Sequence, residues 1–196
     1  MELEYQYECI ISILVENQPS ILTRIVGLLT RRGFIIESLV IGSTEYERLS
    51  RLIIVLPGNL RIVDQITRQL YKLFPVVKVY NLTHIPSITR ELMLVKILAN
   101  HLERRKILEI ARIFNAEIVD CTNTTITLEI SGNSEKIVAV EQMLNSFGIL
   151  EKVRTGKIGV SSESIVAGQL YTVSKDRLRR KLVSSHVMEI EGRLYI

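Results

Sequence analysis

The sequence is poor in the residues on which many metal-binding and disulfide-stabilised proteins depend. Its 196 residues include two cysteines, three histidines and no tryptophan. Cys9 and Cys121 are too few and too isolated for a disulfide framework or a zinc site, which favours a reducing intracellular compartment. His84, His101 and His186 lie far apart, and no two have the spacing of metal ligands. We therefore expect no metal site in this chain.

Motifs that carry catalytic chemistry are missing as well. The sequence has no glycine-rich phosphate loop ending in Lys-Ser/Thr, no GxGxxG, no G-x-S-x-G and no Cys/His signature. The stretch Arg154-Thr155-Gly156-Lys157 looks suited to phosphate, but it follows a predicted strand without the preceding glycine. These absences favour a non-catalytic protein without a cofactor of its own.

Composition and charge argue against membrane and nucleic-acid partners. No apolar run approaches the ~20 residues needed to span a bilayer. The net charge of +4 is spread along a chain of mixed sign, so it does not by itself indicate nucleic acid. RNA-binding sheets need aromatic residues on their central strands, whereas residues 52–55 and 94–97 are aliphatic. Residues 1–8 lack a basic or Arg/Ser-rich leader, so we expect synthesis in the compartment of action.

The first half of the chain alternates between strand and helix patterns in the order β-α-β-β-α-β. Strands are predicted over residues 4–15, 34–43, 49–56 and 76–82. The first helix has Pro19 at its first position and ends at Gly33. The second helix follows Pro57-Gly58-Asn59. Its buried stripe is predicted to be Ile62, Ile66, Leu70, Leu73 and Phe74.

The same order recurs after a proline-containing linker at residues 84–87. Strands are predicted over residues 92–98, 117–121, 125–130 and 149–153, with helices over 102–114 and 134–147. The predicted inward residues of these helices are Ile107, Ile110, Ala111, Phe114, Ile137, Val140, Met143 and Leu144. The sequence thus predicts an α+β protein of two tandem ferredoxin-like βαββαβ units, over residues 4–83 and 88–160.

Each such unit places both helices on one face of an antiparallel sheet, which leaves the other face in need of a partner. A homodimer is therefore expected. Residues 161–196 belong to neither unit and carry several basic residues before a short apolar end. Two interpretations of this tail stay open, a solvated and partly ordered segment or a helix that docks on a partner.

Several stretches together resemble the ACT domain and the following domain of acetolactate synthase small subunits. In the first unit they are Ile11–Asn17, Leu22–Leu28, Arg32–Phe34, Ile36–Leu39, Leu49–Arg51, Gln65–Ile66 and Gln69–Leu73. In the second they are Arg90–Ile97, Ile118–Asp120 and Arg154–Gly156. The resemblance runs from about residue 8 to about residue 162. It implies that the first unit is an amino-acid-sensing ACT domain that pairs with its copy in a homodimer.

The resemblance also implies a function. Such a subunit binds and activates a larger catalytic subunit, which condenses two pyruvates, or pyruvate with 2-oxobutyrate, using thiamine diphosphate, Mg and FAD. It also mediates feedback control by valine or a related branched-chain amino acid, which binds where two ACT domains pair. The residues implied for effector binding are Asn17, Gln18, Pro19, Ser20, Ile21, Leu22, Ile35, Ile36 and Val40.

Physical chemistry supports part of this implied site and questions another part. A helix N-terminus favours a carboxylate, and the Asn17 amide suits an α-amino-acid head group, although capping or turn closure are its alternatives. Family members usually carry glycine at position 20 and asparagine at position 35, and often threonine at position 40. Here these are Ser20, Ile35 and Val40. We expect that activation is retained while valine affinity is reduced, altered or lost.

Two other functions are compatible with the fold. A stand-alone tandem ACT sensor, acting on another enzyme or a transcription factor, would share the first unit but lack the stretch from Arg90 to Ile97. An acyl-phosphate hydrolase would need glycines and an arginine in the first loop, which here reads Glu16-Asn17-Gln18-Pro19. The expected location is the plastid stroma or the bacterial cytoplasm.

Overall fold

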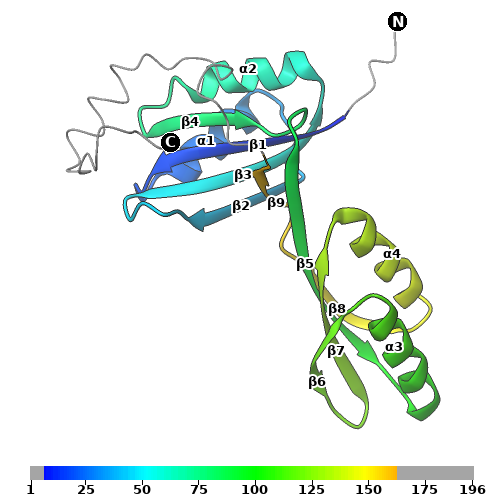
Figure 1. Ribbon diagram of the computed structural model, residues 1–196. Helices are drawn as coiled ribbons and strands as arrows, with labels where there is room; N and C mark the ends of the chain where they lie inside the picture. Colours follow the sequence, from blue (N-terminus) through cyan, green and yellow to red (C-terminus); the bar gives the residue numbers. More distant parts are fainter. Residues whose placement is uncertain (1–6, 163–196) are drawn as a thin grey trace, which may run out of the picture.

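The computed structural model describes residues 7–162, which form two units of one topology linked by a long strand (Figure 1). The first comprises β1 (Tyr7–Glu16), α1 (Ile21–Arg31), β2 (Ser38–Ser43), β3 (Leu49–Gly58), α2 (Leu60–Leu70) and β4 (Val76–Asn81). The second comprises β5 (Ser87–Leu98), α3 (His101–Ile113), β6 (Glu117–Cys121), β7 (Thr125–Gly132), α4 (Ser134–Leu144) and β8 (Gly148–Arg154). A short strand, β9 (Ile158–Ser161), follows. The predicted tandem βαββαβ architecture is confirmed.

The two sheets share one strand order, β2-β3-β1-β4 in the first unit and β6-β7-β5-β8 in the second. All pairs are antiparallel, and the helices of each unit cover one face of its sheet (Figure 1). Alternate residues of the central strands β1 and β5 enter two separate cores: Cys9, Ile11, Ile13 and Val15, and Met93, Val95 and Ile97. Within residues 7–162, every helix falls short of the length and apolarity that crossing a bilayer requires.

The start of the second helix is built alike in both units. A strand ends at Gly58 or Gly132, and the next residue, Asn59 or Asn133, is the N-cap of α2 or α4. Each asparagine side chain accepts a hydrogen bond of 3.0 Å from the backbone N–H three residues later. The cap satisfies a donor that the helix itself leaves unpaired.

The end of the first helix is also repeated. Gly33 and Asn115 follow the C-caps of α1 and α3 with φ of 75° and 47°. The next N–H, of Phe34 or Ala116, donates back to the carbonyl of Leu29 or Ala111. This left-handed closure needs glycine or asparagine, which suffer least from positive φ. The sequence pattern predicted that the first helix ends at Gly33, which agrees with this closure.

Some predicted helix faces are wrong in detail. Phe74 is 64% exposed, because α2 ends at Leu70 and helical spacing no longer places later residues on the buried stripe. Met143 is 45% exposed, since the buried stripe of α4 passes through its neighbour Leu144. Val63, which the prediction omitted, is buried.

Several predicted boundaries also shift. Pro19 does not occupy the first helical position, because Ser20 is the N-cap and α1 begins at Ile21. The strand predicted from residue 34 begins at Ser38, and the one predicted from residue 92 begins at Ser87. The strand β9 was not predicted; it pairs with the first four residues of β5. Most of the predicted tail, residues 163–196, lies outside the described residues.

The N-caps of α3 and α1, Asn100 and Ser20, should contribute unequally to the unfolding free energy. The Asn100 side chain accepts from the N–H groups of Leu102 and Glu103, and the Glu103 carboxylate accepts from the Asn100 N–H. Asn100→Ala is expected to cost about 1 kcal/mol of unfolding free energy. Ser20→Ala should cost only a few tenths (about 0.3 kcal/mol), because Ser20 makes no side-chain cap hydrogen bond. Urea denaturation of both variants tests this; equal losses would contradict the capping assignment.

Candidate functional site

The loop between β1 and α1 is anchored by Asn17. Its Nδ2 donates to the Glu47 carbonyl at 3.2 Å, and its Oδ1 accepts from the Ser50 hydroxyl. The Asn17 backbone N–H donates to the Arg48 carbonyl at 2.9 Å. The amide thus ties the loop to the hairpin between β2 and β3 and does not cap α1. Between capping and turn closure, the structure shows turn closure for Asn17. Its role in effector binding stays a prediction.

The N-terminus of α1 differs from the other three helix starts. The Gln18 carbonyl accepts from the Ile21 N–H at 3.0 Å, but the Ser20 side chain makes no cap hydrogen bond. The other three helices each have an asparagine N-cap whose side chain accepts from the first turn. Among residues 7–162, the N-cap side chain of α1 therefore accepts no hydrogen bond from the first turn, and the positive end of the helix dipole favours an anion there.

The predicted effector residues form two separate groups within one chain. Residues 17–22 surround the start of α1, where Leu22 is 37% exposed. Ile35 and Ile36 follow the end of this 11-residue helix, which is about 16 Å long. Ile35 is 70% exposed, and Val40 lies half-buried on β2. The two groups thus lie at opposite ends of α1.

Strand β2 runs along the outer edge of the first sheet (Figure 1). Among residues 7–162 it pairs with β3 on one side only, so backbone donors and acceptors face outward along its other side. At the end of β2, Ile41, Gly42 and Ser43 are exposed. If a second copy pairs with β2 antiparallel, the Ser43 end of one chain lies beside the Ser38 end of the other. The loop before α1 of one chain then approaches Ile35 of its partner.

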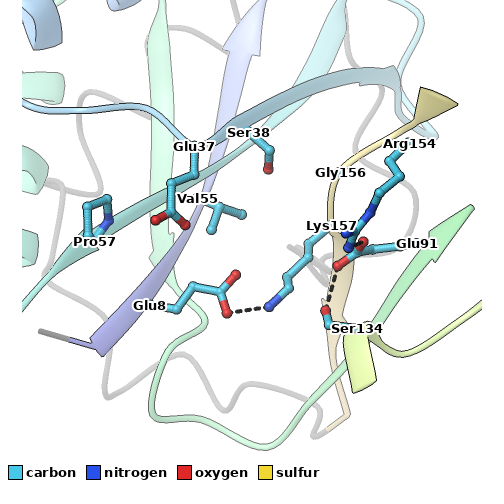
Figure 2. A pocket seen from close by; sticks show the side chains of 10 residues that line it. All are labelled: Glu8, Glu37, Ser38, Val55, Pro57, Glu91, Ser134, Arg154, Gly156 and Lys157. Atoms are coloured by element: carbon cyan, nitrogen blue, oxygen red, sulfur yellow. Dashed lines mark hydrogen bonds and ion pairs between the residues drawn. The ribbon is translucent and has the colours of Figure 1, made fainter. Parts of the chain in front are cut away.

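A cavity of about 740 Å³ lies between the two units, and sequence analysis did not predict it (Figure 2). Both units supply charged side chains to its walls. The first unit contributes Glu8, Glu37, Ser38, Val55 and Pro57. The other wall is formed by Glu91, Ser134, Arg154, Gly156 and Lys157.

Glu91 is the buried carboxylate of this cavity, with a side chain only 3% exposed. The Arg154 guanidinium lies 2.5 Å from it, and the Ser134 hydroxyl donates to it at 2.5 Å. Burial acts to raise the pKa of Glu91, but the hydrogen bonds from Ser134 and Arg154, with the charges of Arg154 and Lys157, lower it below its ordinary value. Glu91 is therefore held ionised in the interior.

The segment after β8 joins the second unit to the first. The Thr155 N–H donates to the Leu92 carbonyl at 3.0 Å, and the Leu92 N–H donates to the Thr155 hydroxyl at 3.1 Å. Lys157 forms an ion pair with Glu8 of β1 (Figure 2). Both cations of the Arg154–Lys157 stretch thus engage carboxylates of the chain itself, so this stretch does not offer a free phosphate site.

Gly156 packs directly on the edge strand. Its φ is +82°, and an added Cβ would lie 2.8 Å from Ser38 Cβ and 3.5 Å from Val40 Cγ2. A side chain here is opposed by the backbone conformation and by a collision with β2. The buried Ser38 hydroxyl has no hydrogen-bond partner within residues 7–162. The segment from the second unit thus touches the strand that carries Val40.

Two family models match the chain in succession. Residues 11–78 match the ACT domain of the small-subunit-like proteins of acetohydroxyacid synthase, and residues 90–163 match the model described as the small subunit of acetolactate synthase. The second match includes both Glu91 and Arg154, the partners of the buried ion pair. The match also contains β9, the strand absent from the prediction.

Relatives and a solved structure agree with these matches. A probable acetolactate synthase small subunit of Archaeoglobus fulgidus is 41% identical over 76% of this chain and 94% of its own length. Acetolactate synthase small subunit 2, chloroplastic, of Arabidopsis thaliana is 42% identical over 79% of this chain. The chain spans only 32% of the length of that plant protein. The crystal structure of the small subunit from Thermotoga maritima has 32% identity and a TM-score of 0.76, and the match covers 81% of this chain and 99% of that one.

The buried ion pair generates a prediction for stability. Arg154→Met leaves the Glu91 carboxylate buried without its cation, which is expected to lower the unfolding free energy by about 1–3 kcal/mol near pH 7. A carboxyl whose folded pKa is lowered gives stability above its unfolded pKa and loses it as pH falls through the folded value. Wild type and variant should therefore converge in stability in acid, as measured by urea denaturation across pH.

Lys152→Met is the matched control on the same strand. The Lys152 side chain is 37% exposed and pairs with Glu141, so its loss should cost less than about 1 kcal/mol. Equal losses for the two variants, or a loss for Arg154→Met that persists unchanged in acid, would contradict the role assigned to Glu91.

Proposed function

The chain belongs to the acetolactate synthase small-subunit family, and we propose that it is the regulatory subunit that binds and activates the acetolactate synthase catalytic subunit. The observation that carries this proposal is the pair of family matches, which together span both units from residue 11 to residue 163. The relative from Archaeoglobus fulgidus adds a match along nearly its whole length. The stand-alone tandem ACT sensor gains no comparable support, because the second unit matches a small-subunit model.

In this proposal the chain is non-catalytic and the partner carries the chemistry. The catalytic subunit holds thiamine diphosphate, Mg and FAD and forms the acetolactate. This chain supplies activation and feedback control by valine or a related branched-chain amino acid. Plastid stroma or bacterial cytoplasm is the proposed location, and the chloroplastic names of the plant relatives favour the first.

We further propose that the effector site is completed only by a homodimer. Residues 17–22 and the pair Ile35 and Ile36 lie at opposite ends of α1 in one chain. Antiparallel pairing through the β2 edges brings the first group of one chain to the second group of its partner. The two-fold axis then produces two equal sites, each next to an α1 N-terminus whose N-cap makes no side-chain hydrogen bond.

The residues proposed for this site are consistent with a weakened response to valine. The start of α1 favours the effector carboxylate, and the apolar surfaces of Leu22, Ile35 and Val40 suit a branched aliphatic side chain. However, Ile35 offers no polar atom to an effector's charged group. The lost hydrogen bond is worth about 1–3 kcal/mol if that group is left without a partner. Activation is therefore proposed to persist while valine control is weakened.

The test is acetolactate production by the cognate catalytic subunit, with and without this chain, across a valine titration. The chain is expected to raise the rate, and valine is expected to reverse the increase weakly or not at all. Ile35→Asn should strengthen the valine response, because it restores a polar partner at the exposed position. Ile113→Asn, at the end of α3 in the second unit, is the matched control, because Ile113 is 69% exposed and lies away from the proposed dimer edge.

Three outcomes separate the parts of this proposal. No stimulation by the wild-type chain would contradict the regulatory function. Stimulation that valine fully reverses in the wild type, supported by tight binding in calorimetry, would contradict the altered effector site. Equal valine responses of wild type and Ile35→Asn would remove Ile35 from the effector site.

A further inference from the structure

The faces of the two sheets that point away from their helices differ in exposure. On the first sheet, Leu14, Ile53 and Tyr80 are only 5–8% exposed on this face. On the second sheet, the corresponding face carries Leu94 and Leu98 of β5 and Val153 of β8, which are 40%, 49% and 57% exposed. Leu94 and Val153 are direct cross-strand neighbours. Within the described part of the chain, the second sheet therefore presents an exposed apolar stripe.

Carboxylates surround this apolar stripe. Glu129 of β7 lies directly opposite Leu94, and Glu117 of β6 lies directly opposite Glu129. Like charges directly opposite each other on a sheet destabilise it. Within residues 7–162, neither glutamate has an ion pair to offset this repulsion. The fold tolerates an unfavourable pair beside an exposed apolar stripe.

The next row of cross-strand neighbours on this face, which passes through Lys96, also carries more negative than positive charge. Asp120 of β6 lies opposite Thr127, and Lys96 of β5 lies between Thr127 and Glu151 of β8. Within residues 7–162, Lys96 is the single cation in the two cross-strand rows that hold Glu117, Glu129, Asp120 and Glu151. We call the surface formed by Leu94, Leu98, Val153, Glu117, Glu129 and Asp120 the acidic sheet face.

The charge of this face decides between two occupants. If a second copy of the chain docked the same face, carboxylates of both copies would be brought together, which is unfavourable in a desolvated contact. A partner with basic residues around an apolar patch would instead pair with Glu117 and Glu129 and cover the stripe. Charge complementarity therefore favours a different, basic partner over a second copy.

We propose that the acidic sheet face docks on a basic, apolar patch of the acetolactate synthase catalytic subunit. This inference rests on the proposed function, which supplies the partner, and adds the surface and its chemistry. It places the contact on the second unit, apart from the β2 edge where the effector site is proposed. The two surfaces are joined by the segment from Arg154 to Lys157, which begins at the last residue of β8 and contacts β2 through Gly156.

The test compares Glu117→Lys with the wild-type full chain for affinity to the cognate catalytic subunit. The substitution turns the like-charge pair with Glu129 into an opposite-charge pair, so the unfolding midpoint should be unchanged or higher. The dissociation constant should nevertheless rise about tenfold, because a cation now faces the basic patch. Wild-type affinity should also fall with added salt, and the variant should show less of this dependence.

Glu109→Lys is the matched control, since Glu109 is exposed on α3 and carries the same charge change to the helix side of the unit. It should leave the affinity unchanged. Equal affinity of wild type and Glu117→Lys would overturn the proposal. A Glu117→Lys chain with altered self-association in sedimentation and normal affinity would assign the face to a second copy instead. If the wild type itself failed to bind any catalytic subunit, the proposed function would fail, and the docking proposal with it.

Discussion

The proposed dimer and its effector site both depend on the edge of β2 that pairs with no other strand within residues 7–162. A strand with only one neighbour leaves a row of backbone donors and acceptors open to pairing, and a second copy is the partner that symmetry offers most simply. Within one chain, the predicted effector residues form two groups that α1 holds apart. Self-pairing is therefore proposed both to satisfy the edge and to complete the effector site.

The closing segment of the second unit connects this edge to the rest of the molecule. Arg154 is fixed by the buried Glu91, Thr155 is hydrogen-bonded to Leu92, and Gly156 lies against Ser38 at the start of β2. A change at the proposed effector site would thus have a short physical route to the second unit. Regulation requires that an effector favour one arrangement of the subunits over another, and this contact is where the arrangements of the two units meet.

The sequence was sufficient for the repeated architecture because local signals agree with the global fold. Hydrophobic periodicity placed the elements, and Gly33 marked the end of a helix. The exposed Phe74 shows where periodicity fails, one turn beyond a helix end. The cavity and the pairing of β9 were beyond reach, since each depends on contacts between segments distant in sequence. The effector residues themselves stay a prediction.

Chemical crosslinking tests the shared effector site most directly, and it does not depend on effector affinity. Ser20→Cys and Ile35→Cys are combined in a Cys121→Ser chain, which removes the exposed native thiol, and treated with a short bismaleimide. The ends of α1 are too far apart for a link within one chain, so a covalent dimer is expected, also when two chains that each carry one introduced cysteine are mixed. A chain that stays monomeric, or links only internally, would contradict pairing through β2.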